Sequence, residues 1–127
     1  MLETGMYEVR VQAGFSAAHQ VRLYDGQLEP LHGHDWQVEA VFRGPALDRI
    51  GVLVDFVAVQ NALREVVAGL NHTNLNEAPL LAGLNPTAEH VARRVFEQLQ
   101  DRLGREAPLT GVWVREAPGC IAAYTVS

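Results

Sequence analysis

Residues 32–43 read His-Gly-His-Asp-Trp-Gln-Val-Glu-Ala-Val-Phe-Arg. Side chains alternate between the two faces of a β-strand, so every second residue shares a face. In a strand, one face of this segment carries His32, His34, Trp36, Val38, Ala40 and Phe42. The two imidazoles therefore point to the same side at one end of an apolar face. They can bind one metal ion that is partly shielded from water.

A catalytic zinc site usually has three protein ligands and keeps an open position for water or substrate. The candidate third ligand is His19, thirteen residues before His32. Glu29 stands three residues before His32, and its carboxylate would lie near the open position. A His-x-His pair by itself is more often two surface histidines than a metal site, so the context of His19 matters.

Three further segments have the pattern of strands. Residues 7–15 alternate strictly between apolar and polar side chains, which predicts a half-buried strand. The turn-prone residues 16–31, including Asp25-Gly26, lead from it into the strand at 32–43. Residues 109–114 and 120–126 are rich in β-branched and apolar side chains, with Ala117-Pro118-Gly119 between them. This order predicts a hairpin at each end of the chain.

The middle of the chain predicts two amphipathic helices. Asp55 is a suitable N-cap for the first helix, and Asn85 followed by Pro86 is a suitable start for the second, which Gly104 would end. The first apolar stripe comprises Phe56, Val59, Leu63, Val66, Val67 and Leu70. The second comprises Ala88, Val91, Val95, Leu99 and Leu103.

The order strand, strand, helix, helix, strand, strand predicts an α+β fold. We expect a four-stranded antiparallel sheet with both helices on one face. A chain of 127 residues is the size of one domain, so residues 1–127 are assigned to a single domain. Because such a sheet has two open edges, we expect assembly with sister subunits.

Composition limits the partners and the compartment. Hydrophobic residues make up 48% and charged residues 20%, values typical of a globular protein. The net charge of −5 argues against a nucleic-acid partner, and no apolar run approaches the ~20 residues of a membrane span. The single Cys120 and the lack of a secretory signal predict a cytoplasmic protein.

All ten basic residues are arginine, so a ligand that carries phosphate would be bound by guanidinium groups. The candidates are Arg10, Arg22, Arg43, Arg49 and Arg115.

Six motifs, in order along the chain, resemble the 6-pyruvoyltetrahydropterin synthase and 6-carboxytetrahydropterin synthase (QueD-like) superfamily of tunnelling-fold pterin enzymes. They are Phe15-Ser16-Ala17-Ala18-His19, His32-Gly33-His34, Val54-Asp55-Phe56, the segment 70–76, the segment 85–89, and Val114-Arg115-Glu116 with Gly119-Cys120. The resemblance implies Zn²⁺ on His19, His32 and His34. It also implies trimers whose sheets join into a barrel, stacked in pairs as hexamers, with active sites at subunit boundaries.

The resemblance also implies where a base should stand. In the pyruvoyl and carboxy enzymes the base is a cysteine four residues before the His-x-His pair, and this chain has Leu28 there. Glu29 follows, as in a branch (type III-like) that uses glutamate and cleaves the dihydroneopterin side chain to 6-hydroxymethyl-7,8-dihydropterin, a folate precursor. We therefore expect Glu29 to be the general acid/base. The alternative is an ordinary solvated loop carboxylate.

Asn71-His72 stands where much of the family has an Asp-His proton relay. Asn71 can accept a hydrogen bond from the imidazole but cannot stabilise an imidazolium as a carboxylate does. We expect His72 to exchange protons, the alternative being a cap on the first helix.

Three other residues are expected to bind or support the pterin. The two oxygens of Glu116 match the paired N–H donors of the 2-amino-pyrimidinone edge, although a surface charge is the alternative. Thr87 resembles the threonine that the family places near the pterin ring, and Glu89 would support the loop that carries Thr87.

The remaining notable side chains receive structural assignments. Cys120 is expected to be a small buried hydrophobe, and His90 to be exposed and uninvolved. Trp36 and Trp113 are expected in the core or an interface.

Three functions follow for testing. The first is a zinc lyase that converts 7,8-dihydroneopterin triphosphate to 6-hydroxymethyl-7,8-dihydropterin. The second is synthesis of a 6-carboxy pterin for the queuosine and deazapurine pathway, or of a 6-pyruvoyl pterin, against which the missing cysteine counts. The third is a family member that binds zinc and a pterin or purine without catalysis, which the replaced cysteine and aspartate make plausible.

Overall fold

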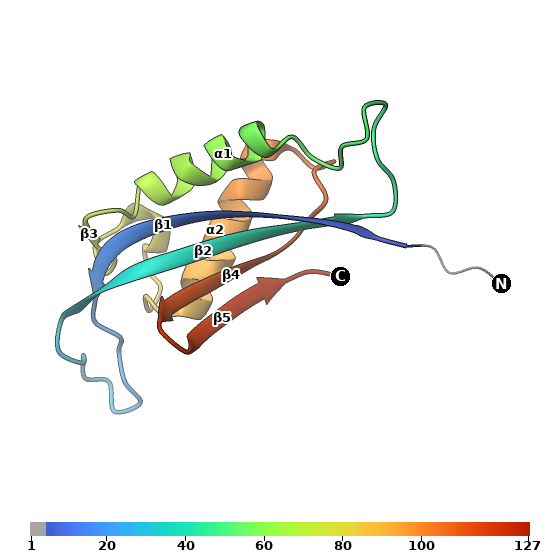
Figure 1. Cartoon of the computed structure of the whole chain (residues 1–127). Coiled ribbons are helices and arrows are strands. Elements are labelled where there is room, and N and C mark those ends of the chain that lie inside the picture. The colour runs from blue at the N-terminus through green and yellow to red at the C-terminus, as the bar shows by residue number, and fades with distance from the viewer. Residues whose placement is uncertain (1–4) are drawn as a thin grey trace.

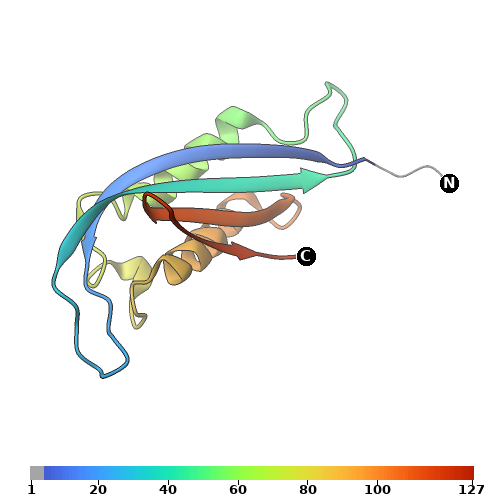
Figure 2. The same ribbon diagram turned by 60° about the horizontal axis from the view of Figure 1, so that its bottom comes forward.

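The computed structural model describes residues 5–127, which form one twisted sheet with two α-helices on one face (Figure 1). The strands are β1 (Tyr7–His19), β2 (His32–Gly44), β3 (Thr73–Asn74), β4 (Leu109–Ala117) and β5 (Cys120–Thr125). The helices are α1 (Phe56–Ala68), the short 3₁₀ helix η1 (Pro79–Leu81) and α2 (Ala88–Leu103). The other face of the sheet is left open (Figure 2).

The predicted α+β class, the helix positions and the two hairpins are confirmed. The prediction of four antiparallel strands was wrong in one respect. The observed sheet has five strands in the order β3-β1-β2-β4-β5, and it is mixed because one pair is parallel. The extra strand β3 pairs parallel with β1 over only two residues, Ala17 with Thr73 and Ala18 with Asn74. Such a short strand has no periodicity of its own. It exists because the chain after α1 returns alongside β1.

Strand β1 also runs beyond its predicted end at Phe15, as far as His19. Residues 16–18 are Ser-Ala-Ala, which are all small and do not alternate between polar and apolar. The sequence pattern therefore does not predict a strand there. Pairing on both sides keeps them extended, with β2 on one side and β3 on the other.

The core lies between the helices and the inner face of β1, β2 and β4. The alternation predicted for the first two strands is confirmed, with Val11 and Phe15 of β1 and Trp36 of β2 buried. From the helices, Leu63 of α1 and Leu99 of α2 are completely buried. Burial of these apolar surfaces is the main force that holds the layers together.

Helix ends follow the sequence only in part. Asp55 caps α1 as predicted, since its Oδ1 accepts from the Val57 amide at 2.9 Å, and Gly104 ends α2 with a φ of 94°. The assignment of Asn85 as the cap of α2 was wrong. The cap is Thr87, whose Oγ1 accepts from the His90 amide at 3.2 Å. Both residue types suit an N-cap, so only the tertiary position of the chain decides between them.

Three burial predictions were wrong and one was confirmed. Phe56, the first residue of α1, is 59% exposed. Cys120 is exposed at the start of β5, and His90 is half-buried with its Nδ1 2.6 Å from the Asn85 carbonyl oxygen. Trp36 belongs to the core as expected, and no helix within residues 5–127 is long and apolar enough to cross a membrane.

Shortening a buried side chain of α1 should show how much the packing of this helix against the sheet contributes to stability. We expect Leu63→Ala to lower the free energy of unfolding by about 2–5 kcal/mol, because it leaves a cavity in a fully buried site. Val57→Ala on the same helix is the matched control, since Val57 is 68% exposed. Its effect should stay within about 0.5 kcal/mol. Urea denaturation measures both, and equal losses would contradict the assigned packing.

Candidate metal centre and active site

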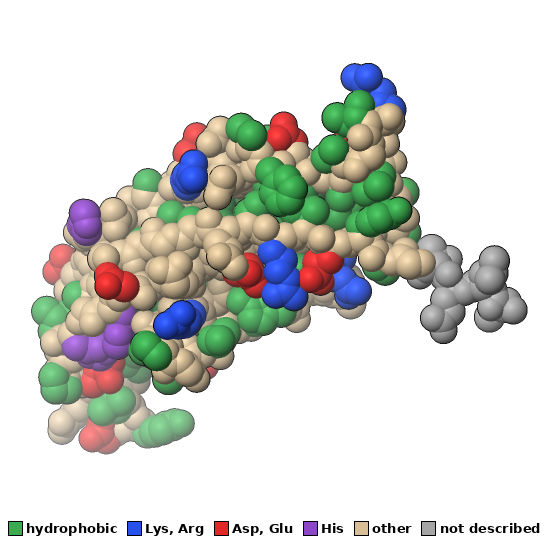
Figure 3. Space-filling model, in the orientation of Figure 1, with side chains coloured by type: hydrophobic (Ala, Val, Ile, Leu, Met, Phe, Trp, Pro, Cys, Tyr) green, Lys and Arg blue, Asp and Glu red, His purple; other side chains and the backbone are tan. Residues whose placement is uncertain are grey.

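Three histidines converge where β1 and β2 meet at the end of the sheet. The antiparallel register places His19 opposite His32, and His34 follows on the same face of β2. One ring nitrogen from each lies within 4.8 Å of the others, and the Nε2 atoms of His19 and His32 are 3.1 Å apart. Histidine side chains gather beside acidic ones at this end of the molecule (Figure 3). The structure thus brings together all three candidate metal ligands.

Hydrogen bonds on the far side of two rings orient them toward the cluster. Nδ1 of His19 lies 2.8 Å from the Pro86 carbonyl oxygen, and Nδ1 of His32 lies 2.9 Å from that of Pro30. A carbonyl only accepts, so each Nδ1 carries the proton and each Nε2 presents a lone pair. Metal-binding histidines are typically held in this way.

The donor set fits a divalent metal ion. Two imidazole lone pairs that face each other at 3.1 Å repel unless a proton or cation lies between them. Three neutral imidazoles are a usual ligand set for Zn²⁺ with an open fourth position. Trp36 lies edge-on to His19 with ring centroids 5.0 Å apart, so the inner side of the cluster is dry. The His32 side chain, by contrast, is 38% exposed, which leaves the outer side open.

Two carboxylates flank the cluster. Glu29 Oε1 lies 3.7 Å from His32 Nε2 and accepts from the Val21 amide at 3.0 Å. Glu116, near the end of β4, has its Oε1 3.2 Å from His19 Nε2. The side chains of Glu29 and Glu116 are 26% and 27% exposed, so solvent reaches both. A ligand at the open side of the cluster would meet one carboxylate on either flank.

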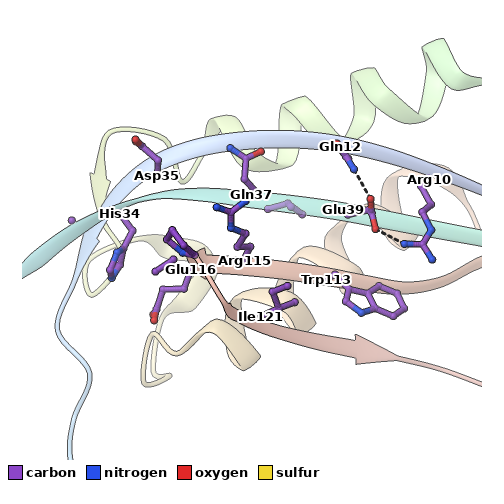
Figure 4. Close-up of a pocket in the computed structure, with 14 residues that line it drawn as sticks. Arg10, Gln12, His34, Asp35, Gln37, Glu39, Trp113, Arg115, Glu116 and Ile121 are labelled. Carbon is purple, nitrogen blue, oxygen red and sulfur yellow. Dashed lines mark hydrogen bonds and ion pairs between the residues drawn. The ribbon is translucent and has the colours of Figure 1, made fainter.

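A cavity of about 840 Å³ runs from the cluster along the open face of the sheet. His34, Arg115 and Glu116 lie at one end of it, and Arg10 and Glu39 at the other (Figure 4). Its size is within the range of small-molecule sites. The cavity therefore offers the metal cluster a ligand-sized approach that Glu116 borders.

Of the candidate phosphate-binding arginines, Arg115 is the best placed. Arg10 also lines the cavity, but its guanidinium bonds Glu8 and Glu39 at 2.8 Å each, and these carboxylates raise the pKa of Arg10. Arg43 lies 3.4 Å from Glu8. Arg22 donates to the Gly26 carbonyl, and Arg49 lies in the exposed loop after β2. Arg115 has no ion pair within residues 5–127 and lies beside Glu116.

The predicted relay pair borders a second cavity. His72 lines a space of about 420 Å³ together with His34, Asp35 and Ser16. Its φ of 58° is unusual for a residue other than glycine, and its amide donates to the Ser16 carbonyl at 2.6 Å. Asn71 Oδ1 accepts from the Ser16 amide at 2.9 Å, whereas we expected the His72 imidazole as its donor.

Sequence reasoning missed Ser16 and Asp35. The Ser16 hydroxyl donates to Asp35 Oδ1 at 2.6 Å, across the paired strands that carry the metal ligands. The signal was available, since Asp35 adjoins His34 and Ser16 precedes His19 by three residues. Both residues border the cavity that His72 lines together with His34.

Thr87 and Glu89 both stand at the start of α2. Thr87 caps α2, and Glu89 is exposed in the first turn of that helix. Among the described residues, neither belongs to the lining of the two cavities above. Their predicted contact with a ligand stays a prediction.

A sheet whose long hairpin ends in three convergent histidines defines the class: an α+β protein with a candidate metal site open to a cavity. Residues 8–127 match the family described as 6-pyruvoyl tetrahydropterin synthase, and the chain belongs to that family.

Named relatives differ in their reactions. The 6-carboxy-5,6,7,8-tetrahydropterin synthase of Bacillus subtilis is 31% identical over 127 residues, covering 93% of this chain and 84% of the relative. The dihydroneopterin monophosphate aldolase of Pyrococcus furiosus is 33% identical over 98 residues, covering 77% of this chain and 79% of the relative.

Solved structures share the fold. The 6-pyruvoyl tetrahydropterin synthase of Caenorhabditis elegans superposes with a TM-score of 0.84 at 22% identity, covering all of both chains. Two structures of the Plasmodium vivax enzyme superpose with a TM-score of 0.79 at 18% identity, covering 94% of this chain and 97% of theirs. They are described as catalytic-residue mutants in which a glutamate is replaced by alanine or cysteine.

Removal of one imidazole should abolish stable metal binding. We expect the wild-type chain to retain one divalent metal ion after dialysis and His34→Ala to lose it, because two imidazoles leave the site short of a ligand. His72→Ala is the control and should retain the metal, since His72 lies outside the cluster. Elemental analysis by mass spectrometry measures the stoichiometry. Metal retained by His34→Ala would contradict the assigned ligand set.

Proposed function

We propose that this chain is a zinc-dependent lyase that cleaves the side chain of 7,8-dihydroneopterin triphosphate, or of a close relative, to give 6-hydroxymethyl-7,8-dihydropterin. The observation that carries the proposal is the place of Glu29, whose carboxylate lies 3.7 Å from an imidazole of the candidate metal site. Leu28 stands where a cysteine base would be expected, so the carboxylate is the available base. The Pyrococcus relative named as an aldolase supports this reaction type.

The proposed reaction breaks the bond between C1′ and C2′ of the side chain. A base removes the proton of the 2′ hydroxyl, the C2′ carbon becomes an aldehyde, and the bonding electrons pass to C1′. C1′ then takes up a proton and becomes the hydroxymethyl carbon, while the two-carbon aldehyde keeps the phosphates. Bound Zn²⁺ would supply Lewis-acid polarisation of the side-chain hydroxyls.

The residues of this chain have distinct parts in that reaction. Glu29 accepts the hydroxyl proton, and its orientation is set by the Val21 amide at 3.0 Å. His72, with Asn71 beside it, exchanges protons with solvent from the cavity that it shares with His34. Glu116 anchors the pterin edge through both oxygens, and Arg115 attracts the phosphates. Thr87 and Glu89 support the pterin site from the start of α2.

Assembly belongs to the same proposal. Strand β5 has a free outer edge, and β3 covers only two residues of β1. Unpaired edges favour pairing with another chain. We propose that these edges join sheets into trimers, stacked in pairs as hexamers, and that a neighbouring subunit completes the substrate site.

A 6-carboxy pterin product is the second candidate, because the Bacillus relative of that name aligns over 93% of this chain. Incubation of zinc-loaded protein with 7,8-dihydroneopterin triphosphate, followed by chromatography and mass spectrometry, separates the products. The 6-hydroxymethyl pterin supports the lyase, and a 6-carboxy or 6-pyruvoyl pterin overturns it. Binding of the pterin without turnover would instead indicate a non-catalytic member of the family.

The role of Glu29 is tested by Glu29→Gln, which keeps the shape of the side chain and removes its ability to accept a proton. We expect kcat to fall by about 10²–10⁴-fold, the usual contribution of general acid–base catalysis. Zinc content should be unchanged, since Glu29 lies beside the cluster and is not one of its ligands. Glu77→Gln, an exposed loop residue, is the control and should keep full turnover. Equal activity of the two variants would contradict the role of Glu29 as the general acid/base.

A further inference from the structure

The main chain continues in an extended path beyond the end of β1, although no strand lies beside it on the β3 side. Two asparagine side chains take the place of that strand. Asn76 Oδ1 accepts from the Gln20 amide at 2.7 Å, and its Nδ2 donates to the Gln20 carbonyl at 2.8 Å. Asn85 does the same for Arg22, at 2.7 and 3.0 Å. Both hydrogen-bonding groups of each residue are thereby satisfied.

Val21, between Gln20 and Arg22, turns its main-chain groups to the opposite side and bonds Glu29. The Glu29 amide donates to the Val21 carbonyl at 3.0 Å, and the Val21 amide donates to the Glu29 carboxylate at 3.0 Å. The side-chain amide of Gln20 adds a bond to the Glu29 carbonyl at 3.2 Å. The segment 20–22 is thus held by the asparagines on one side and holds the carboxylate on the other.

Both asparagines are anchored on parts of the molecule that lie outside this loop. The Asn85 carbonyl accepts from the Thr87 amide at 2.8 Å and lies 2.6 Å from His90 Nδ1, both at the start of α2. Asn76 follows β3, and its amide donates to Asn74 Oδ1 at 3.0 Å. Because the loop between β1 and β2 projects from the end of the sheet, these anchors tie it to the body of the protein (Figure 2).

We propose that Asn76 and Asn85, together the amide clamp, are positioning residues for Glu29. They fix segment 20–22 so that the Val21 amide holds the carboxylate beside the metal cluster. The inference rests on the proposed role of Glu29 as general acid/base. Only a side-chain amide combines an acceptor with a donor at the spacing of a peptide group, whereas aspartate offers acceptors alone.

The test uses Asn76→Asp and Asn85→Asp, which keep the size and the accepted bond but place an oxygen against a backbone carbonyl. We expect each to lower kcat about tenfold or more while KM is unchanged, since small displacements of a catalytic group are costly. Zinc content and the absorption spectrum of the Co²⁺-substituted protein should not change. Hydrogen exchange in peptides covering residues 20–29 should rise.

Asn61→Asp is the matched control, because it makes the same change at an exposed position of α1. It should leave turnover and exchange as in the wild type. Where an aspartate variant fails to fold, Asn76→Ala or Asn85→Ala removes both side-chain bonds without adding a charge, with the same expected results.

Unchanged exchange at residues 20–29 in both variants would overturn the clamp, and so would unchanged kcat. Loss of zinc in step with turnover would also overturn it, since the asparagines would then act through His19. A wild-type chain without pterin turnover would overturn the proposed function instead. In that case hydrogen exchange still decides whether the amide clamp holds segment 20–22.

Discussion

The antiparallel pairing of β1 with β2 sets the position of every metal-ligand candidate. The ladder runs without a shift from Tyr7 opposite Gly44 to His19 opposite His32. A slip by one residue would turn the side chains of the slipped strand to the other face and separate the histidines. A slip of β1 would also expose Val11 and Phe15, and a slip of β2 would expose Trp36, all of which are buried in the core. Packing of the hydrophobic core therefore keeps the three candidate metal ligands in register.

The end of the sheet combines a dry and a wet side around one cluster. His19 is fully buried against Trp36 and the Pro86 carbonyl, whereas Glu29 and Glu116 are partly open to solvent. This asymmetry is typical of metal sites that also bind a small ligand. The cavity along the open face of the sheet is bordered by His34 of the cluster and by Glu116, and it lies outside the buried core.

Polar side chains hold the end of the sheet where regular pairing stops. Asn76 and Asn85 extend the ladder past β1, and Asn71 accepts from the Ser16 amide. The main-chain carbonyl of Pro86 adds an acceptor for His19 Nδ1. One short segment, residues 85–87, both bonds the candidate metal ligand His19 and starts α2. Hydrogen bonds thus link the helix, the loop and the histidine cluster, which limits the freedom of the carboxylate on the projecting loop.

The sequence by itself determined the α+β class, the four long strands, both helices and the three histidines, because alternation and 3.6-residue periodicity are local consequences of burial. Tertiary structure alone decided the two-residue strand β3, the choice of Thr87 over Asn85 as a cap, and the exposure of Cys120. It also decided the amide clamp, whose bonds join residues 56 and 63 positions apart. Hydrogen bonds between distant segments leave no periodic trace, since they depend on where the packed core brings the chain.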